Sequence, residues 1–146
     1  IKLSRMLNKE LLFPLDLICS NSIDNSPFEE PVSFRKISDD MIGLDIGPKT
    51  IKKIKNILES AETVIWNGPL GFFEKEEFSN GTKEIAFFLR DLSKNKINVV
   101  AGGGDTASAL SLYECIDDFT HVSTGGGASL SLLSGKRLNS LERLEI

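Results

Sequence analysis

The segment Ile97-Asn98-Val99-Val100-Ala101-Gly102-Gly103-Gly104-Asp105-Thr106 decides the fold class of this 146-residue chain. It combines a short β-branched apolar run, a glycine turn and a polar residue suited to the start of a helix. Two further segments have the same form: Trp66 precedes Asn67-Gly68-Pro69-Leu70-Gly71, and Ser123 precedes Thr124-Gly125-Gly126-Gly127-Ala128-Ser129. Repeated strand-to-helix junctions are typical of βα units, so we expect an α/β fold with a mainly parallel sheet.

The same alternation extends along the rest of the chain. Strands are expected at 15–19, 63–66, 97–101 and 119–123, whereas 41–45 suits either a strand or an extended connector. Helices are expected to begin near Thr50 and to cover 82–94, 106–113 and 128–133. Residues 21–31 are rich in Asn, Ser, Asp and Pro and are expected to form a loop, and 32–34 is too short to assign. No linker divides the chain, so we expect a single domain.

Composition narrows the classes of function. The net charge of −4 argues against a nucleic-acid partner, and no apolar run is long enough to cross a bilayer. The first residues lack the apolar core of a signal peptide, and Ile1 is not an initiator Met, which suits a chain that begins inside a longer protein. Cys19 and Cys115 match no metal spacing and are expected to be reduced, partly buried thiols. A single histidine, His121, argues against a multi-histidine metal site.

The three glycine turns favour a phosphate ligand. Turns that follow parallel strands meet at one edge of the sheet, where open α/β sheets bind ligands. Each turn precedes a helix whose first N–H groups attract an anion, and glycine lets the backbone approach that anion closely. The alternative is that these turns are only tight connections between strands and helices. One such turn would fit that alternative, but three turns at the same edge favour a ligand.

Standard phosphate motifs are a poor match. Gly81-Thr82-Lys83 fails the order that a P-loop requires. Gly102, Gly104 and Ala107 match the loose dinucleotide pattern, but no acidic residue follows at the expected distance. A nicotinamide-binding domain is therefore the less favoured interpretation.

Two acidic residues near these turns have two readings each. Asp105 could hold a divalent cation between itself and phosphates, as Mg²⁺ commonly requires, or it could cap a helix. Glu74 could accept hydrogen bonds from ribose hydroxyls or be a solvated acid beside a helix. The residues alone leave the choice open for Asp105 and favour the solvated reading for Glu74.

Four segments together resemble phosphoglycerate kinase. They are Gly43-Leu44-Asp45-Ile46-Gly47-Pro48, Trp66-Asn67-Gly68-Pro69-Leu70-Gly71-Phe72-Phe73-Glu74, Gly102-Gly103-Gly104-Asp105-Thr106 and His121-Val122-Ser123-Thr124-Gly125-Gly126-Gly127-Ala128-Ser129. Their order and spacing are also similar to those of the family, from about Leu15 nearly to Ile146. Phe72 departs from the family, in which a smaller aliphatic residue is common.

The resemblance implies a fold and a reaction. The fold would be an incomplete Rossmann-like three-layer parallel sheet, with residues 1–146 forming part of a nucleotide-binding domain. The family transfers a phosphoryl group reversibly from 1,3-bisphosphoglycerate to ADP in glycolysis, giving ATP and 3-phosphoglycerate, with Mg²⁺. A cytoplasmic, monomeric full-length enzyme is implied, with no membrane or nucleic-acid partner.

The resemblance also assigns site residues. Asp105 would hold the metal–nucleotide complex, and Glu74 would bind ribose. Gly125, Gly126 and Gly127 would stabilise the phosphoryl group in transfer. The remaining nucleotide-binding residues would be Gly43, Leu44, Asn67, Pro69, Gly71, Gly102, Gly103, Gly104 and Thr106.

The family's substrate domain and the first strands of its nucleotide domain have no counterpart in this sequence. The basic cluster that binds phosphoglycerate belongs to that missing part. We therefore expect this chain by itself to be inactive, and a non-catalytic nucleotide-binding or structural module is the alternative function.

Overall fold

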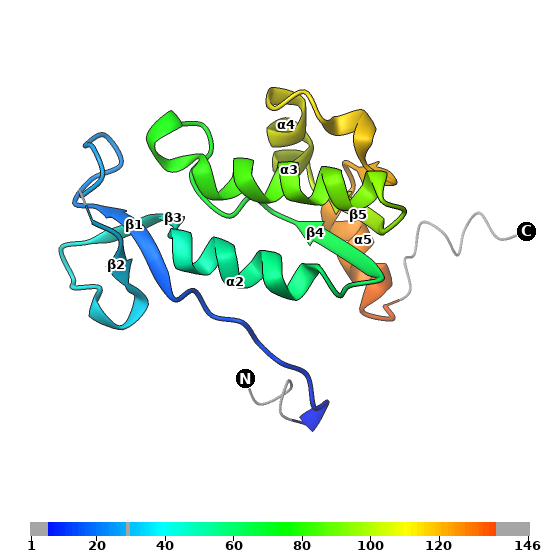
Figure 1. The fold of residues 1–146 in the computed structure, drawn as a ribbon, viewed down its shortest axis with the longest axis horizontal. Helices are drawn as coiled ribbons and strands as arrows, with labels where there is room; N and C mark the ends of the chain where they lie inside the picture. Colours follow the sequence, from blue (N-terminus) through cyan, green and yellow to red (C-terminus); the bar gives the residue numbers. More distant parts are fainter. Residues whose placement is uncertain (1–5, 29, 137–146) are drawn as a thin grey trace, which may run out of the picture.

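Two three-stranded sheets form the framework of the fold (Figure 1). The computed structural model describes residues 6–28 and 30–136. The first sheet has the order β2-β1-β3 and contains β1 (Asp16–Ser20), β2 (Val32–Ser33) and β3 (Ile42–Ile46). The second sheet has the order β4-β5-β6 and contains β4 (Thr63–Asn67), β5 (Asn98–Gly102) and β6 (His121–Ser123).

The second sheet is parallel throughout, as the βα alternation predicts. Two helices provide its crossovers: α3 (Asn80–Lys94) joins β4 to β5, and α4 (Gly104–Leu112) joins β5 to β6. All three strands therefore end at the same edge. The α/β class and the incomplete Rossmann-like sheet expected from the sequence are confirmed here.

The first sheet differs from a purely parallel expectation. β1 pairs antiparallel with both β2 and β3. The connections explain the difference, because a parallel pair needs a long crossover. The connection from β1 to β2 is the loop 21–31, which contains no helix in its described residues, and that length suits an antiparallel return; β3 then pairs with the other edge of β1. The ambiguous segment 41–45 is thus a strand, shifted by one residue.

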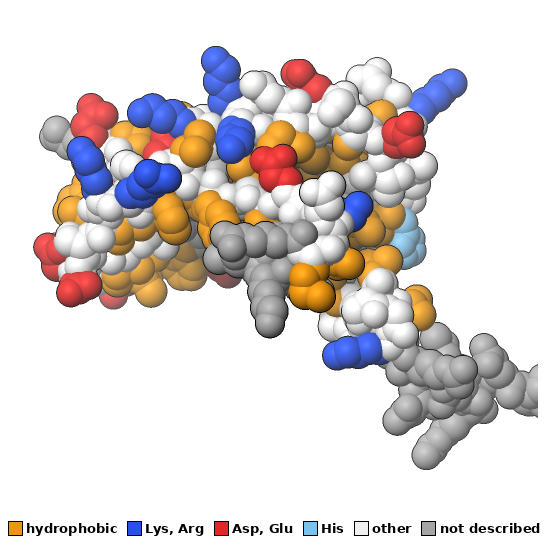
Figure 2. All heavy atoms as spheres, turned by 90° about the horizontal axis from the view of Figure 1, so that it is seen from below, with side chains coloured by type: hydrophobic (Ala, Val, Ile, Leu, Met, Phe, Trp, Pro, Cys, Tyr) orange, Lys and Arg blue, Asp and Glu red, His pale blue; other side chains and the backbone are white. Residues whose placement is uncertain are grey.

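Helices cover the two faces of the parallel sheet unequally. The helices α2 (Pro48–Leu58), α3 and α4 lie on one face, and α5 (Gly126–Leu133) lies on the other (Figure 1). Alternation along β4 follows this arrangement, since Trp66 is 7% exposed in the core and Ile65 is 51% exposed on the α5 side. The view from below shows many apolar side chains at the surface (Figure 2). Exposed apolar residues of the chain include Phe13 and Leu15 before β1, Ile57 in α2, Ile65 in β4 and Leu133 in α5.

All four α-helices of the described residues begin two residues earlier than their periodicity predicts, including α3, which begins at Asn80 and not at Thr82. Pro48 opens α2 in place of Thr50, because proline's fixed φ suits the first helical turn. Gly104 and Gly126 open α4 and α5, ahead of the expected Thr106 and Ala128. Glycine is a poor helix former, which is why the periodic pattern does not extend to these positions.

The two cysteines are as the sequence predicts. Cys19 and Cys115 are free thiols, and both are buried. Burial raises the pKa of each thiol, which keeps both protonated and unreactive. None of the described helices has the length and apolarity that a membrane span requires.

A buried carboxylate joins β1 to the start of α2. Asp16 is 3% exposed, and its two oxygens accept hydrogen bonds from the N–H groups of Thr50 at 2.8 Å and Lys49 at 3.1 Å. The Thr50 hydroxyl in turn accepts the N–H groups of Leu15 and Asp16. Asp16 therefore satisfies free N–H groups of α2 from a neighbouring strand, where Gly47 at the N-cap has no side chain to do so.

A second buried carboxylate joins β3 to α3. Asp45 is 2% exposed and accepts the N–H groups of Gly81 at 2.7 Å and Ile46 at 2.8 Å. Burial raises the pKa of Asp45 to about 6, although these two hydrogen bonds oppose the shift. The raised pKa means that burial disfavours the ionised form.

We predict that Asp45 makes folding stability fall with pH. Because its pKa is about 6 when folded and close to 3.8 when unfolded, the folded state binds the proton more tightly. The contribution is complete below pH 4 and is lost as the pH rises through 6, by about 2–3 kcal/mol in total. Urea unfolding of the parent and of Asp45→Asn between pH 4 and 7.5 measures it. The difference between the two should change over that window, and a constant difference would contradict the assignment.

The core of the parallel sheet gives a second prediction. Leu110 is fully buried in α4 and Leu112 of the same helix is 61% exposed. Leu110→Ala should lower the free energy of unfolding by about 2–5 kcal/mol, because it leaves a cavity against β5. Leu112→Ala is the matched control and should change stability by less than about 0.5 kcal/mol. Chemical denaturation checks both variants, and equal losses would show that α4 packs differently.

Candidate functional site

The residues singled out in the sequence gather in two neighbouring places at the carboxyl edge of the parallel strands. One is a pocket between β3 and the turn after β4, and the other is formed by the turns after β5 and β6. The turn at 67–71 contributes to both. The structure therefore brings together segments that are more than 50 residues apart.

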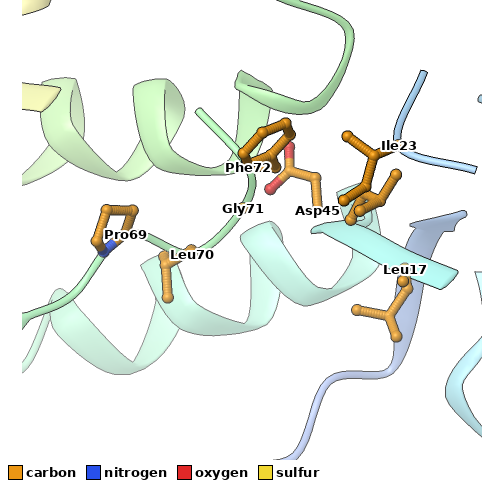
Figure 3. Close-up of a pocket in the computed structure, with 9 residues that line it drawn as sticks. Leu17, Ile23, Asp45, Pro69, Leu70, Gly71 and Phe72 are labelled. Atoms are coloured by element: carbon orange, nitrogen blue, oxygen red, sulfur yellow. The ribbon is translucent and has the colours of Figure 1, made fainter. Parts of the chain in front are cut away.

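The first place is a pocket of about 390 Å³, here called the β3 pocket (Figure 3). The predicted residues Gly43, Leu44, Pro69 and Gly71 all line it. The rest of its lining is mostly apolar and comprises Leu17, Ile23, Asp45, Leu70 and Phe72. An apolar wall with exposed backbone groups suits a flat aromatic ligand such as a nucleobase.

The turn that forms one wall of this pocket is fixed by hydrogen bonds from other elements. The hydroxyl of Thr82, in the first turn of α3, accepts the N–H groups of Leu70 at 3.1 Å and Gly71 at 3.2 Å. Phe72 N–H donates to the Leu44 carbonyl at 2.7 Å. A side chain cannot replace the hydrogen at Gly71, because its Cβ would lie 2.1 Å from an Asp45 carboxylate oxygen. The wall is thus built against β3 and α3.

The second place is formed by backbone at the start of α4. Gly103 has a φ of 97°, a conformation that favours glycine, and it directs the chain from β5 into α4. Within the described residues, the N–H groups of Gly104, Asp105 and Thr106 donate to no protein acceptor, and the first helical bond runs from Ala107 N–H to the Gly103 carbonyl. Free N–H groups and the helix dipole at this end attract an anion.

The turn after β6 packs directly on the turn after β5. Gly103 N–H donates to the Ser123 carbonyl at 2.8 Å. A Cβ on Gly126 would lie 2.7 Å from Gly103 Cα and 3.2 Å from Asn67 Oδ1. Gly125 is the N-cap of α5, so Gly126 and Gly127 open a second helix beside the first. Asn67, Gly102, Gly103 and Gly126 therefore form one continuous cluster.

Asp105 is free to act on a ligand. Its side chain is exposed at the start of α4 and makes no hydrogen bond or ion pair with the described residues. Gly103 occupies the N-cap position, so the helix-capping reading of Asp105 is wrong. Across the described part of the chain no three His, Cys, Asp or Glu side chains form a metal cage. One carboxylate beside free helix N–H groups would fit Mg²⁺ bound to a phosphate ligand, because Mg²⁺ takes its other ligands from phosphates and water.

The structure gives the side chains of two predicted site residues, Thr106 and Glu74, surroundings that the sequence did not predict. Thr106 is fully buried, and its hydroxyl accepts Gly68 N–H at 2.8 Å, so it joins two turns and leaves only its backbone N–H for a ligand. Glu74 is exposed just beyond the β3 pocket and is not part of its lining. It precedes the short 3-10 helix Glu76–Phe78.

Sequence reasoning missed two residues that support the site, Asp45 and Thr82, and one that lines it, Ile23. None of the three belongs to a complete phosphate-binding motif, and nothing in their spacing connects them to the turns. Asp45 lies inside a quoted segment, and its signal was an acidic residue in an otherwise apolar strand. Such a residue is rarely buried without a specific partner.

The sequence of this chain is similar to those of known proteins over most of its length. The family model described as phosphoglycerate kinase matches residues 1–136. Among curated proteins, phosphoglycerate kinase of Thermosynechococcus vestitus is 42% identical over 136 residues, covering 93% of this chain and 34% of that protein. Phosphoglycerate kinase of Onion yellows phytoplasma is 43% identical over 137 residues, covering 94% of this chain and 34% of that protein.

Solved structures agree. The structure of phosphoglycerate kinase from Coxiella burnetii matches with a TM-score of 0.81 and 32% identity, covering 92% of this chain and 34% of that one. Phosphoglycerate kinase from Pyrococcus horikoshii OT3 matches with a TM-score of 0.72 and 30% identity, covering 90% and 32%. The chain thus spans about a third of the length of these relatives. A family match over almost the whole chain, with the same fold, shows that the chain belongs to the phosphoglycerate kinase family.

Proposed function

We propose that this chain is the nucleotide-binding part of a phosphoglycerate kinase. The complete enzyme would transfer a phosphoryl group reversibly from 1,3-bisphosphoglycerate to ADP in glycolysis, giving ATP and 3-phosphoglycerate. The observation that carries the proposal is the junction of an apolar pocket with two adjacent helix N-termini. A nucleoside diphosphate has the matching chemistry, because it joins an aromatic base to a chain of anionic oxygens.

Each part of the ligand has a proposed partner. The β3 pocket receives the base against Gly43, Leu44, Pro69 and Gly71. Glu74, which is exposed two residues after Phe72 of the pocket lining, accepts hydrogen bonds from the ribose. Asn67 and the segment 102–106 receive the phosphates, whose charge the free N–H groups of α4 offset.

Asp105 is the proposed ligand for Mg²⁺. A carboxylate alone would repel the nucleotide phosphates, and bound Mg²⁺ supplies the positive charge that joins the two. Gly125, Gly126 and Gly127 bring the N–H groups of α5 beside this position. These groups stabilise negative charge on the phosphoryl group in transfer, which depends on positioning and electrostatics more than on covalent chemistry.

The alternative is a nucleotide-binding module without turnover. A nicotinamide-dependent oxidoreductase is disfavoured, since the family model and the structural neighbours are kinases. For the complete enzyme we propose a monomer of the cytoplasm that binds neither nucleic acid nor membranes.

Removal of the Asp105 carboxylate tests the metal assignment. Asp105→Ala should weaken Mg·ADP binding by at least about tenfold, because the bridge between protein and phosphates is lost. In EDTA the order should reverse, with the variant binding free ADP as well as or better than the parent, since an uncompensated carboxylate repels phosphates. Titration calorimetry measures both conditions. Asp117→Ala removes an exposed acid beyond the other end of α4 and is the control. Equal Mg·ADP affinity in Asp105→Ala and the parent would refute the metal site.

Activity of the isolated chain tests whether this part of the family can catalyse the reaction by itself. We expect no phosphoryl transfer above background, because the basic groups that hold the phosphoglycerate lie in the part of the relatives that this chain does not span. A coupled assay that follows ATP formation from 1,3-bisphosphoglycerate and ADP measures it, with a full-length relative as the positive control. Measurable turnover by the chain alone would contradict this expectation and reject the non-catalytic module.

A further inference from the structure

The loop between β1 and β2 supplies one wall of the β3 pocket. Ile23 from this loop lines the pocket with Phe72, which comes from the turn after β4 (Figure 3). Ile23 is 43% exposed, so the core does not hold it. The position of this wall must therefore depend on what fixes the loop.

The loop is compact and bonded mainly to itself. The buried Ser20 hydroxyl donates to the carbonyls of Asn25 and Ser26, and the Asn25 amide donates to Asn21 Oδ1 at 2.7 Å. These bonds join the two sides of the loop and tie its base to β1, and none of them involves Ile23 or Asp24. They do not place the tip relative to the pocket.

Lys75 joins the tip of the loop to the opposite wall. Its ammonium donates to the Ile23 carbonyl at 2.8 Å and to the Asp24 carboxylate at 2.8 Å. Among the described residues, these are the only hydrogen bonds that Ile23 and Asp24 make with a residue outside the loop, and both residues accept them. Asp24 is 87% exposed and Lys75 34% exposed, and the ammonium lowers the pKa of the Asp24 carboxyl.

The other end of this connection is rigid. Lys75 N–H donates to the Phe72 carbonyl at 3.1 Å, so Lys75 belongs to the same tight turn as Phe72 and Glu74. That turn is itself bonded to β3 and α3. The contact of Lys75 with the loop therefore fixes one wall of the β3 pocket relative to the other.

We propose that Lys75 is a positioning residue for nucleoside binding, which holds the Ile23 wall over the β3 pocket. This inference rests on the proposed nucleotide function. Lys75 does not touch the base in this arrangement, and it acts through the loop. It should consequently affect the affinity for a nucleoside diphosphate more than the affinity for a diphosphate without a nucleoside.

The test compares Lys75→Met with the parent chain, using Mg·ADP and Mg·pyrophosphate as probes in titration calorimetry. Methionine keeps the apolar stem and removes both donors. We expect the dissociation constant for Mg·ADP to rise about two- to fivefold, as for an exposed charged contact, with a smaller change for Mg·pyrophosphate. Lys75→Arg should restore most of the loss. Lys83→Met, which removes an exposed charge from the first turns of α3, controls for net charge.

Hydrogen exchange tests the loop without any ligand. In Lys75→Met the amides of residues 21–28 should exchange faster, while those of α2 and α3 and the unfolding temperature stay unchanged. Unchanged exchange, or an equal loss for both probes, would overturn the role of Lys75 while leaving the proposed function intact. No binding of Mg·ADP by the parent would instead overturn the proposed function and the nucleoside role of Lys75 with it.

Discussion

The backbone at Gly103 lies against the backbone at Gly126, at a distance that leaves no room for a side chain between the two turns. Two hydrogen bonds complete this contact, from Gly103 N–H to the Ser123 carbonyl and from Gly68 N–H to the Thr106 hydroxyl. The three turns thus form one packed unit, in which a shift of one turn would displace the others. The direction of α4 and α5, and hence of their free N–H groups, depends on that contact.

A second level of organisation lies behind the turns, at the start of α3. Gly81 N–H is bonded to Asp45, and the neighbouring Thr82 hydroxyl receives two N–H groups of the turn after β4. The first residues of one helix therefore hold both β3 and the turn after β4, which line the β3 pocket. Because Asp45 is buried and bonded to backbone N–H groups, this support consists of polar contacts inside the protein, where they are strong and costly to break.

Local sequence patterns predicted the parallel sheet and the meeting of the three glycine turns at one edge. Strands β4, β5 and β6 lie within two residues of their expected limits, and all three turns meet at one edge. The antiparallel sheet was harder, because strand direction depends on the length of a connection and on pairing across the chain. The apolar run at 15–19 has no feature that distinguishes a parallel from an antiparallel partner.

The residues that support the site could not be predicted from local sequence patterns either, because their contacts also join distant parts of the chain. Ile23 and Lys75 are 52 positions apart, and each is unremarkable among its own neighbours. Thr106 illustrates the opposite case, since its type and place were anticipated but its hydroxyl serves another turn. Whether a polar group faces a ligand or the protein is decided by packing that no single segment contains.

The crowding around the Asp45 carboxylate has a consequence for how this pocket can change in evolution or design. A Cβ at Gly71 or at Gly81 would lie 2.1 Å or 2.3 Å from the same Asp45 oxygen. These three positions, on a strand, a turn and a helix, therefore share one small volume. Enlarging either glycine requires a shorter residue at 45, which would release the Gly81 N–H. A change of ligand preference by single substitutions is thus easier at the rim, around Ile23 and Phe72, than at the floor of the pocket.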